Sequence, residues 1–366
     1  MRIAARFVTA LLLFPAGPLP AQITREEYAA RRDSIAARIG DGLLIAIGGV
    51  TPVSDFGPFY QLPAFRYLTG YEYTDAALVM VVRDGRGRST LFVKRTAPRT
   101  SLYYGAEPDS VALARDLDLA SRPIEQLTAV VDSLIRAGAR RVYEVRDFAA
   151  ADFARQDSLT RGGQLVKALA ARHAGLEIQD AHPLLDQLRA RKTEAELALI
   201  RKAAEISAAG HTELMRRIGP GMHEYDLQAI IEHEFRRGGA ERPAYGSIVG
   251  SGPLSLQLHY MKNRRAMQPG DVVVIDAGAE YQGYTADVTR TLPVGGTYSP
   301  EQRAVYQIVR DAQAAAERNS KAGLSIRAAL DSSIAVRARG LAGLGLIESP
   351  EATLDLPWPA NCSASP

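Results

Sequence analysis

The sequence predicts a mixed α/β (α+β) protein with two domains. The chain has 366 residues, of which 46% are hydrophobic and 23% charged, a composition that is ordinary for globular proteins. Segments with the hydrophobic spacing of a helix alternate with short hydrophobic runs, which is typical of folds that combine helices with a sheet. At usual domain sizes this length corresponds to two domains, each large enough to bury a core.

The first 21 residues predict an export signal. Arg2 and Arg6 give a positive start, residues 7–14 (FVTALLLF) form a hydrophobic run too short to span a bilayer, and Ala21 suits a cleavage site. A short buried helix is the alternative, but three prolines directly after the run disfavour it. No later stretch reaches transmembrane length. The mature chain is therefore expected in the periplasm or outside the cell, without a membrane as partner after cleavage.

Residues 22–187 are predicted to form the first domain. Hydrophobic spacing predicts helices over 25–39, 124–137 and 163–173, a strand over 42–47, and a hairpin of 77–82 with 90–93 closed by residues 84–87.

Residues 188–366 are predicted to form the second domain. The sequence Thr-Glu-Ala-Glu at 193–196 has the form of a capping box and predicts the start of a long helix, which ends at 219–221 (GPG). A second helix is predicted over 223–237, strands within 244–252 and 271–293, and a further helix from Ser299.

Charge and cysteine content exclude several classes of function. Without Arg2 and Arg6 the 44 basic side chains fall to 42, against 41 acidic ones, and the arginines are scattered along the chain. Such a balance argues against nucleic acid as a partner. Cys362 is the only cysteine, which excludes internal disulfides and cysteine-based zinc sites.

Two aspartates carry the chemistry that the sequence indicates. If 272–277 and 284–289 form a hairpin centred on Tyr281-Gln282, Asp276 and Asp287 stand directly opposite each other on one face. Opposed carboxylates destabilise a sheet unless a cation or a shared proton lies between them. Oxygen ligands of this kind suit Mn, Mg or Ca, and bridging carboxylates can hold two metals. The alternative is that Asp276 caps a buried strand and Asp287 is a surface residue.

Two dipeptides on the second predicted helix resemble half of a zinc-protease motif. They are His223-Glu224 and His233-Glu234, but neither completes His-Glu-x-x-His. We therefore expect both to lie on solvated helix faces.

Three ordered blocks of the second domain match a known family. They are 245–252 with 258–260, then 270–293, then 296–303 with 305–306, while 65–71 (FRYLTGY) matches more weakly in the first domain. The chain resembles the M24B pita-bread metallopeptidases, and among them the Xaa-Pro aminopeptidase (aminopeptidase P) family. The resemblance implies a creatinase-type N-terminal domain over 22–187 and a pita-bread catalytic domain over 188–366.

The resemblance also implies the site and its reaction. Asp276 and Asp287 match the first two of five ligands in a dinuclear site that usually holds two Mn²⁺ ions, other divalent metals being possible. His259 matches a catalytic histidine beside the metals; the alternative is a structural histidine at a strand end. Substrates would be peptides with proline at the second position, attacked by a metal-activated water, and the enzyme would be a homo-oligomer.

The chain departs from the family pattern after Asp287. No histidine follows His259, and no later glutamate has the context of the family's ligands. Three of the five expected ligands are thus missing, so we expect a C-terminally truncated product, with an incomplete pita-bread domain and little or no peptidase activity. The alternatives are a non-catalytic pita-bread protein that binds peptides or partners, and a prolidase-type dipeptidase.

Overall fold

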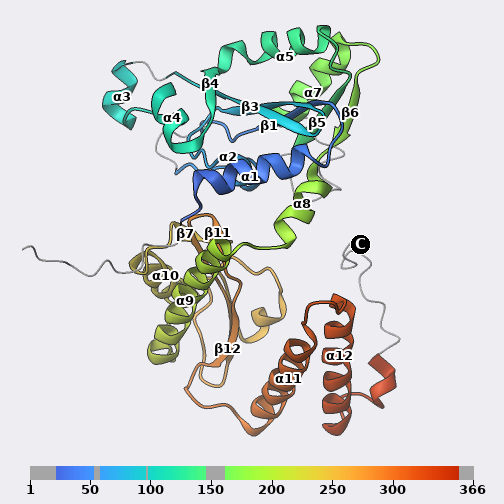
Figure 1. The fold of residues 1–366 in the computed structure, drawn as a ribbon. Coiled ribbons are helices and arrows are strands. Elements are labelled where there is room, and N and C mark those ends of the chain that lie inside the picture. Colours follow the sequence, from blue (N-terminus) through green and yellow to red (C-terminus); the bar gives the residue numbers. More distant parts are fainter. Residues whose placement is uncertain (1–21, 53–57, 96–97, 146–160, 354–366) are drawn as a thin grey trace, which may run out of the picture. The chain divides into compact units, whose positions relative to one another are not determined.

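A computed structural model describes residues 22–52, 58–95, 98–145 and 161–353 (Figure 1). The predicted signal, residues 1–21, lies outside the described residues. The chain forms two compact units, Met1–Leu199 and Ile200–Pro366, which are described separately. The unit boundary lies inside helix α9 (Glu194–Arg217), so the domain limits given above stay a prediction.

A six-stranded mixed sheet with helices on both faces forms the first unit. Its strand order is β4-β3-β2-β1-β5-β6, with β1 antiparallel to β2 and parallel to β5. The strands are β1 (Gly42–Ile47), β2 (Ala77–Arg83), β3 (Arg86–Val93), β4 (Ala120–Pro123), β5 (Arg141–Val145) and β6 (Glu177–Asp180). The helices are α1 (Arg25–Ala36), α2 (Pro63–Thr69), α3 (Pro98–Tyr104), α4 (Ser110–Leu117), α5 (Leu127–Arg136), α7 (Arg161–Arg172) and α8 (His182–Ala190), with a 3-10 turn η1 (Ile124–Gln126).

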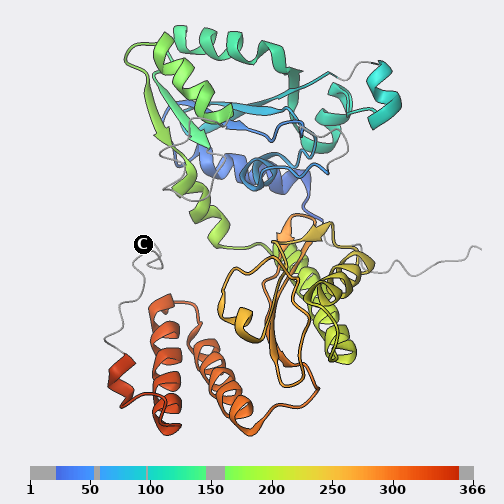
Figure 2. The ribbon, with the colours of Figure 1, turned by 180° about the vertical axis from the view of Figure 1, so that it is seen from behind.

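Strand β1 lies at the centre of this unit because both of its faces are hydrophobic. Leu44 packs in one core with Phe65 of α2, and Leu43 packs in the other with Val131 of α5. Figures 1 and 2 show α1 and α2 on one face of the sheet and α5 and α7 on the other. The predicted hairpin is confirmed as β2 and β3, and its turn is Asp84-Gly85, both with positive φ.

Helices α9 and α10 and two small sheets build the second unit. The sheets have the orders β12-β9-β8 and β11-β10-β7. The elements are α10 (Glu224–Arg237), β7 (Arg242–Pro243), β8 (Ile248–Ser251), η2 (Gly252–Leu256), β9 (Val272–Asp276), β10 (Ala279–Tyr281), β11 (Tyr284–Thr285), β12 (Thr289–Pro293), α11 (Pro300–Asn319), α12 (Ile326–Gly343) and η3 (Pro350–Thr353).

One hydrophobic core joins helices α9 and α10 to strand β9. Leu214 of α9 and Ile231 of α10 pack with Val273 and Ile275 of β9. Burial of such side chains favours folding by about 1.5–3 kcal/mol each. Helix α11 begins directly after Ser299, as predicted, and Ser299 forms a capping box with Gln302.

The register of the strands that carry the two aspartates differs from the expectation. Asp276 pairs with Thr289, not with Asp287, and the turn is Gln282-Gly283 rather than Tyr281-Gln282. Gln282 and Gly283 have φ of 49° and 79°, the conformation that a two-residue hairpin turn requires. Glycine adopts it freely, so the turn is centred one residue later than predicted and the pairing shifts by two.

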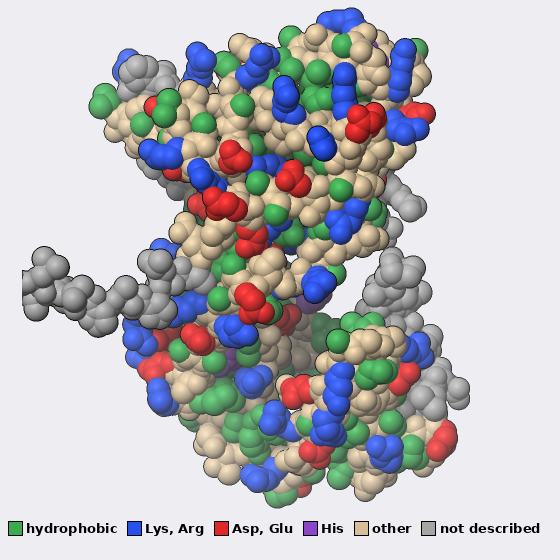
Figure 3. All heavy atoms as spheres, viewed as in Figure 1, with side chains coloured by type: hydrophobic (Ala, Val, Ile, Leu, Met, Phe, Trp, Pro, Cys, Tyr) green, Lys and Arg blue, Asp and Glu red, His purple; other side chains and the backbone are tan. Residues whose placement is uncertain are grey.

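Surface composition and helix hydrophobicity complete the description. On the face that Figure 3 shows, basic and acidic side chains are interspersed. Among the described helices, none is both long and hydrophobic enough to cross a membrane.

Candidate metal centre

Asp276 and Asp287 meet at one side chain, Tyr245. The tyrosine hydroxyl lies 2.5 Å from Asp276 Oδ1 and 3.1 Å from Asp287 Oδ1. Asp276 ends strand β9 and is half-buried, whereas Asp287 lies between β11 and β12 and is exposed. The two carboxylates are therefore close together, as the sequence predicts, although they are not directly opposite each other.

The backbone next to Asp276 is held by a close approach of two chain segments. A Cβ added to Gly278 would lie 1.8 Å from the carbonyl oxygen of Ala286, so only glycine fits. The amide of Ala277 donates to the carbonyl of Val288, and the amide of Ala286 donates to the carbonyl of Ala279, both at 3.1 Å. These contacts keep the segments that carry the two aspartates side by side.

Two buried side chains of α9 fix the same backbone from the helix side. Ser207 Oγ accepts a hydrogen bond of 2.9 Å from the amide of Ala279, and His211 Nε2 donates to the carbonyl of Ala277 at 3.0 Å. Burial lowers the pKa of His211, and the hydrogen bond to Ala277 offsets this only in part. Sequence reasoning missed these contacts, because Ser207 and His211 occupy ordinary positions of an amphipathic helix.

The electrostatics of the pair favour a cation. The pKa of Tyr245 lies well above its usual value. Burial is the largest cause, and the hydrogen bond to Asp276 and the charges of both aspartates add to it, so the hydroxyl stays protonated. One hydroxyl proton can be donated to only one of the two carboxylates at a time. The other carboxylate then faces the hydroxyl oxygen without a donor, and oxygen ligands of this kind suit a hard divalent ion.

The donor set that the described residues offer does not fit a dinuclear centre. Within the described ranges, no group of three or more His, Cys, Asp or Glu side chains could hold a metal ion. Asp276 and Asp287 therefore supply two carboxylates, with Tyr245 as a neutral neighbour. Such a set can neutralise one divalent ion, but it leaves most of the ion's coordination positions to water.

His259 lies in the turn that follows η2, and its side chain is exposed. In the part of the chain that the structure describes, no hydrogen bond joins it to Asp276 or Asp287. Its catalytic role stays a prediction.

The expectation that Glu224 lies on a solvated helix face is wrong. Its exposed fraction is 0%, and its carboxylate accepts hydrogen bonds from Ser251 of β8 and from Tyr260 in the loop that carries His259. Glu234 is buried as well and pairs with Arg237, whereas His233 is exposed as expected. The sequence signal for Glu224 was its place at the first turn of a helix, where a carboxylate is favoured.

A groove of about 940 Å³ runs between strand β12 and helix α11. Asp287 is part of its lining, so the groove reaches the carboxylate pair. The aromatic rings of Tyr298 and Tyr306, 5.1 Å apart, lie on the helix side.

Comparison with known proteins gives the family of both units. Residues 198–345 match the model of metallopeptidase family M24, and residues 28–143 match that of the aminopeptidase P N-terminal domain. The Xaa-Pro aminopeptidase of Escherichia coli K12 is 32% identical over 344 residues, covering 89% of this chain and 75% of that protein. The Xaa-Pro aminopeptidase of Haemophilus influenzae is 30% identical, covering 91% and 76%.

Solved structures agree with these sequence matches. Proline aminopeptidase P II from Yersinia pestis superimposes with a TM-score of 0.80 at 32% identity, covering 91% of this chain and 77% of that one. A Zn-substituted aminopeptidase P of E. coli in complex with product gives a TM-score of 0.78 at 30% identity, with the same coverage. The predicted fold class, a creatinase-type N-terminal domain followed by a pita-bread domain, is confirmed.

Relatives more than 30% identical cover most of both chains, and one of their solved structures has the same fold. The chain belongs to metallopeptidase family M24 and, within it, to the Xaa-Pro aminopeptidases, a family of hydrolases.

Proposed function

We propose that this chain binds one divalent cation, preferably Mn²⁺, through Asp276 and Asp287, and that it recognises peptides with proline at the second position. The observation that carries the proposal is the shared hydroxyl of Tyr245, which brings both carboxylates to one point. The substrate class is taken from the relatives named Xaa-Pro aminopeptidase. His259 is proposed to contact the substrate or to move protons.

We further propose that the 366-residue chain has little or no peptidase activity. Two carboxylates hold a divalent ion more weakly than a full ligand set does, and no histidine follows His259 in the sequence. The chain would then bind its peptides without hydrolysing them at a useful rate. Its metal affinity and its turnover can therefore be tested separately.

Metal binding is tested by calorimetric titration of the metal-free chain with MnCl₂. We expect about one ion per chain, and at least tenfold weaker binding in Asp276→Asn and in Asp287→Asn, because each change removes a charged ligand. The matched control is Asp311→Asn, an exposed aspartate on α11. Equal affinity in the wild type and in the double Asn variant would contradict the site.

Turnover is tested with a Xaa-Pro peptide and added Mn²⁺. We expect no release of the first residue above the level of Asp276→Ala. Robust turnover that Asp276→Ala abolishes would refute the proposed inactivity while supporting the metal site. A Xaa-Pro dipeptide in parallel separates a prolidase-type activity, since a dipeptidase would cleave it in preference to longer peptides.

Export and assembly are proposed from the sequence and the family resemblance alone. Residues 1–21 would be removed on export, which intact-mass measurement of the protein from the culture medium or periplasm tests. A homo-oligomer is expected, and light scattering decides it.

A further inference from the structure

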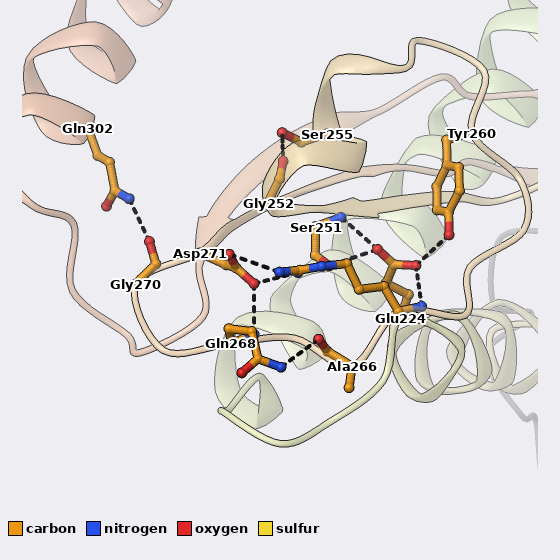
Figure 4. Close-up of polar contacts among 11 residues, drawn as sticks. Glu224, Ser251, Gly252, Ser255, Tyr260, Ala266, Gln268, Gly270, Asp271 and Gln302 are labelled. Atoms are coloured by element: carbon orange, nitrogen blue, oxygen red, sulfur yellow. Dashed lines mark hydrogen bonds and ion pairs between the residues drawn. The ribbon is translucent and has the colours of Figure 1, made fainter.

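The loop of residues 252–271, here called the His259 loop, is held from the inside by buried polar side chains. It joins strand β8 to strand β9 and contains the 3-10 turn η2. Figure 4 shows Glu224 of α10 with its carboxylate turned toward Ser251 and Tyr260, while Asp271 lies at the far end of the loop. The network thus connects both ends of the loop to the first turn of α10.

Glu224 is the centre of this network. Its Oε1 accepts hydrogen bonds from the amide and the hydroxyl of Ser251, at 2.8 and 2.7 Å. Its Oε2 accepts from the Tyr260 hydroxyl and from the amide of Arg265, both at 2.9 Å. A carboxylate offers about four acceptor positions, and all are used here. Hydrogen bonds to a charged group are worth more than neutral ones.

Arg265 closes the network at the other end of the loop. Its guanidinium donates to Ser251 Oγ at 2.8 Å and to Asp271 Oδ2 at 2.5 Å. Burial alone would raise the pKa of Asp271, but the hydrogen bonds from Arg265 and from the amide of Gln268 outweigh burial and hold that pKa below its usual value. The charged pair fixes the chain just before strand β9.

Asn263 provides a second, independent anchor. It is almost fully buried, and its backbone has a φ of 51°, which asparagine tolerates better than most residues. Its side chain accepts from the amide of Val249 at 3.0 Å and donates to Ser247 O and to Gln228 Oε1, both at 2.8 Å. The loop is therefore tied to strand β8 and to helix α10 by a side chain that does not touch Glu224.

The anchored residues alternate with exposed ones. Tyr260 and Asn263 point inward, whereas Leu258, His259 and Met261 are exposed, the leucine to 86% and the methionine to 60%. Exposed hydrophobic side chains would favour collapse of an unanchored loop onto the nearest hydrophobic surface. The buried contact with Glu224 instead ties down Tyr260, the residue next to His259.

We propose that Glu224 and Asn263 are positioning residues. Through the loop they hold His259, before any ligand binds, in the position that its proposed role requires. The importance of His259 in this inference rests on the proposed function. The ordering of the loop by Glu224 and Asn263 does not depend on it. Such pre-organisation removes the cost of ordering the loop when a peptide binds.

The test compares Tyr260→Phe with the wild type in the metal-free full chain. The change removes only the hydroxyl, which donates to Glu224 and accepts a 3.5 Å hydrogen bond from the amide of Arg264. The matched control is Tyr298→Phe, which removes a hydroxyl that donates to the carbonyl of Thr291 in the same unit but away from the loop. Hydrogen exchange by mass spectrometry reports on residues 252–264. The Cε1–H resonance of His259, assigned with His259→Gln, reports on the imidazole.

We expect exchange in the loop to become at least about tenfold faster in Tyr260→Phe, as the loss of a hydrogen bond to a charged acceptor implies. The His259 resonance should broaden or split, while exchange elsewhere and the thermal midpoint stay as in Tyr298→Phe. Asn263→Gly, which keeps the positive φ, should give the same result through the second anchor.

Two outcomes would overturn the proposal. One is unchanged loop exchange together with an unchanged His259 resonance in both variants. The other is a loss of protection that is equal throughout the second unit, because the network would then stabilise the fold without positioning His259. Neither measurement uses metal or substrate. A failure of the metal titration therefore does not affect this test, and a failure of this test does not affect the proposed metal site.

Discussion

Replacing Gly278 by alanine tests whether the carboxylate pair depends on the close approach of its two backbone segments. The added methyl would meet the Ala286 carbonyl at 1.8 Å and its carbon at 2.6 Å. Both are backbone atoms, so no side-chain rotation relieves the overlap. Because the φ of Gly278 lies outside the left-handed region, the close approach alone accounts for the effect.

The magnitude follows from the hydrogen bonds that flank the glycine. To reach even the tightest contacts seen for real Cβ atoms, the segments must separate by more than about 1 Å. The bonds from Ala277 to Val288 and from Ala286 to Ala279, both 3.1 Å, would then be lost. Each is worth about 1 kcal/mol net, and leaving buried groups unpaired adds more. We expect a loss of about 2–4 kcal/mol.

Urea titration followed by far-UV circular dichroism measures this loss. The matched control is Gly295→Ala, where an added Cβ meets nothing within 4 Å and φ lies outside the left-handed region. That change should leave stability equal or raise it by up to about 1 kcal/mol. Gly278→Ala should also weaken Mn²⁺ binding, since it moves Asp276 relative to Asp287. Equal midpoints for the two alanine variants would refute the reasoning.

Two further predictions concern buried charged or titratable groups. Burial holds the pKa of His211 in the folded state below its unfolded value, so neutral His211 supports stability above about pH 6.5, and this support is lost as the pH falls. His211→Gln should therefore flatten the drop in urea midpoint between about pH 7.5 and 5.5. An equally steep drop in the variant would contradict this. Arg31 pairs with buried Glu196 at 3.2 Å, so Arg31→Met should lower the free energy of unfolding by about 3 kcal/mol. Arg25→Met, which removes an exposed pair, should leave the urea midpoint unchanged. Similar midpoints for the two variants would contradict this prediction.

Much of the fold could be predicted because its signals are local. The hydrophobic spacing predicts a helix over 25–39, which is α1 (Arg25–Ala36), and one over 223–237, which is α10 (Glu224–Arg237). Helix α12 was missed, because its small and polar residues give no clear hydrophobic stripe. Its place depends on packing: a Cβ on Gly340 would lie 2.6 Å from Ile308 of α11, and such a contact is not visible in a single sequence.

The parts of the candidate site that the sequence did not reveal depend on contacts far apart in the chain. Tyr245 reaches aspartates 31 and 42 residues away, and Glu224 binds Arg265 across 41 residues. Neither spacing has a period that a pattern could detect. The sequence favours a surface position for Glu224 because glutamate is rarely buried unless it is paired, and its partners Ser251, Tyr260 and Arg265 are distant in the chain.

The predicted strand register is wrong by two residues, and a shift of this size leaves the two aspartates on the same face. Side chains alternate between the faces of a strand, so a slip of one residue moves every side chain to the other face, whereas a slip of two returns it to the same face. The turn at Gln282-Gly283 shifted the pairing by two, so that Thr289 rather than Asp287 lies opposite Asp276. Asp287 became a diagonal neighbour on the same face, still within reach of the hydroxyl that contacts Asp276. The shared face of the two aspartates is therefore a safer prediction than their exact pairing. It depends only on whether the register shifts by an even number of residues.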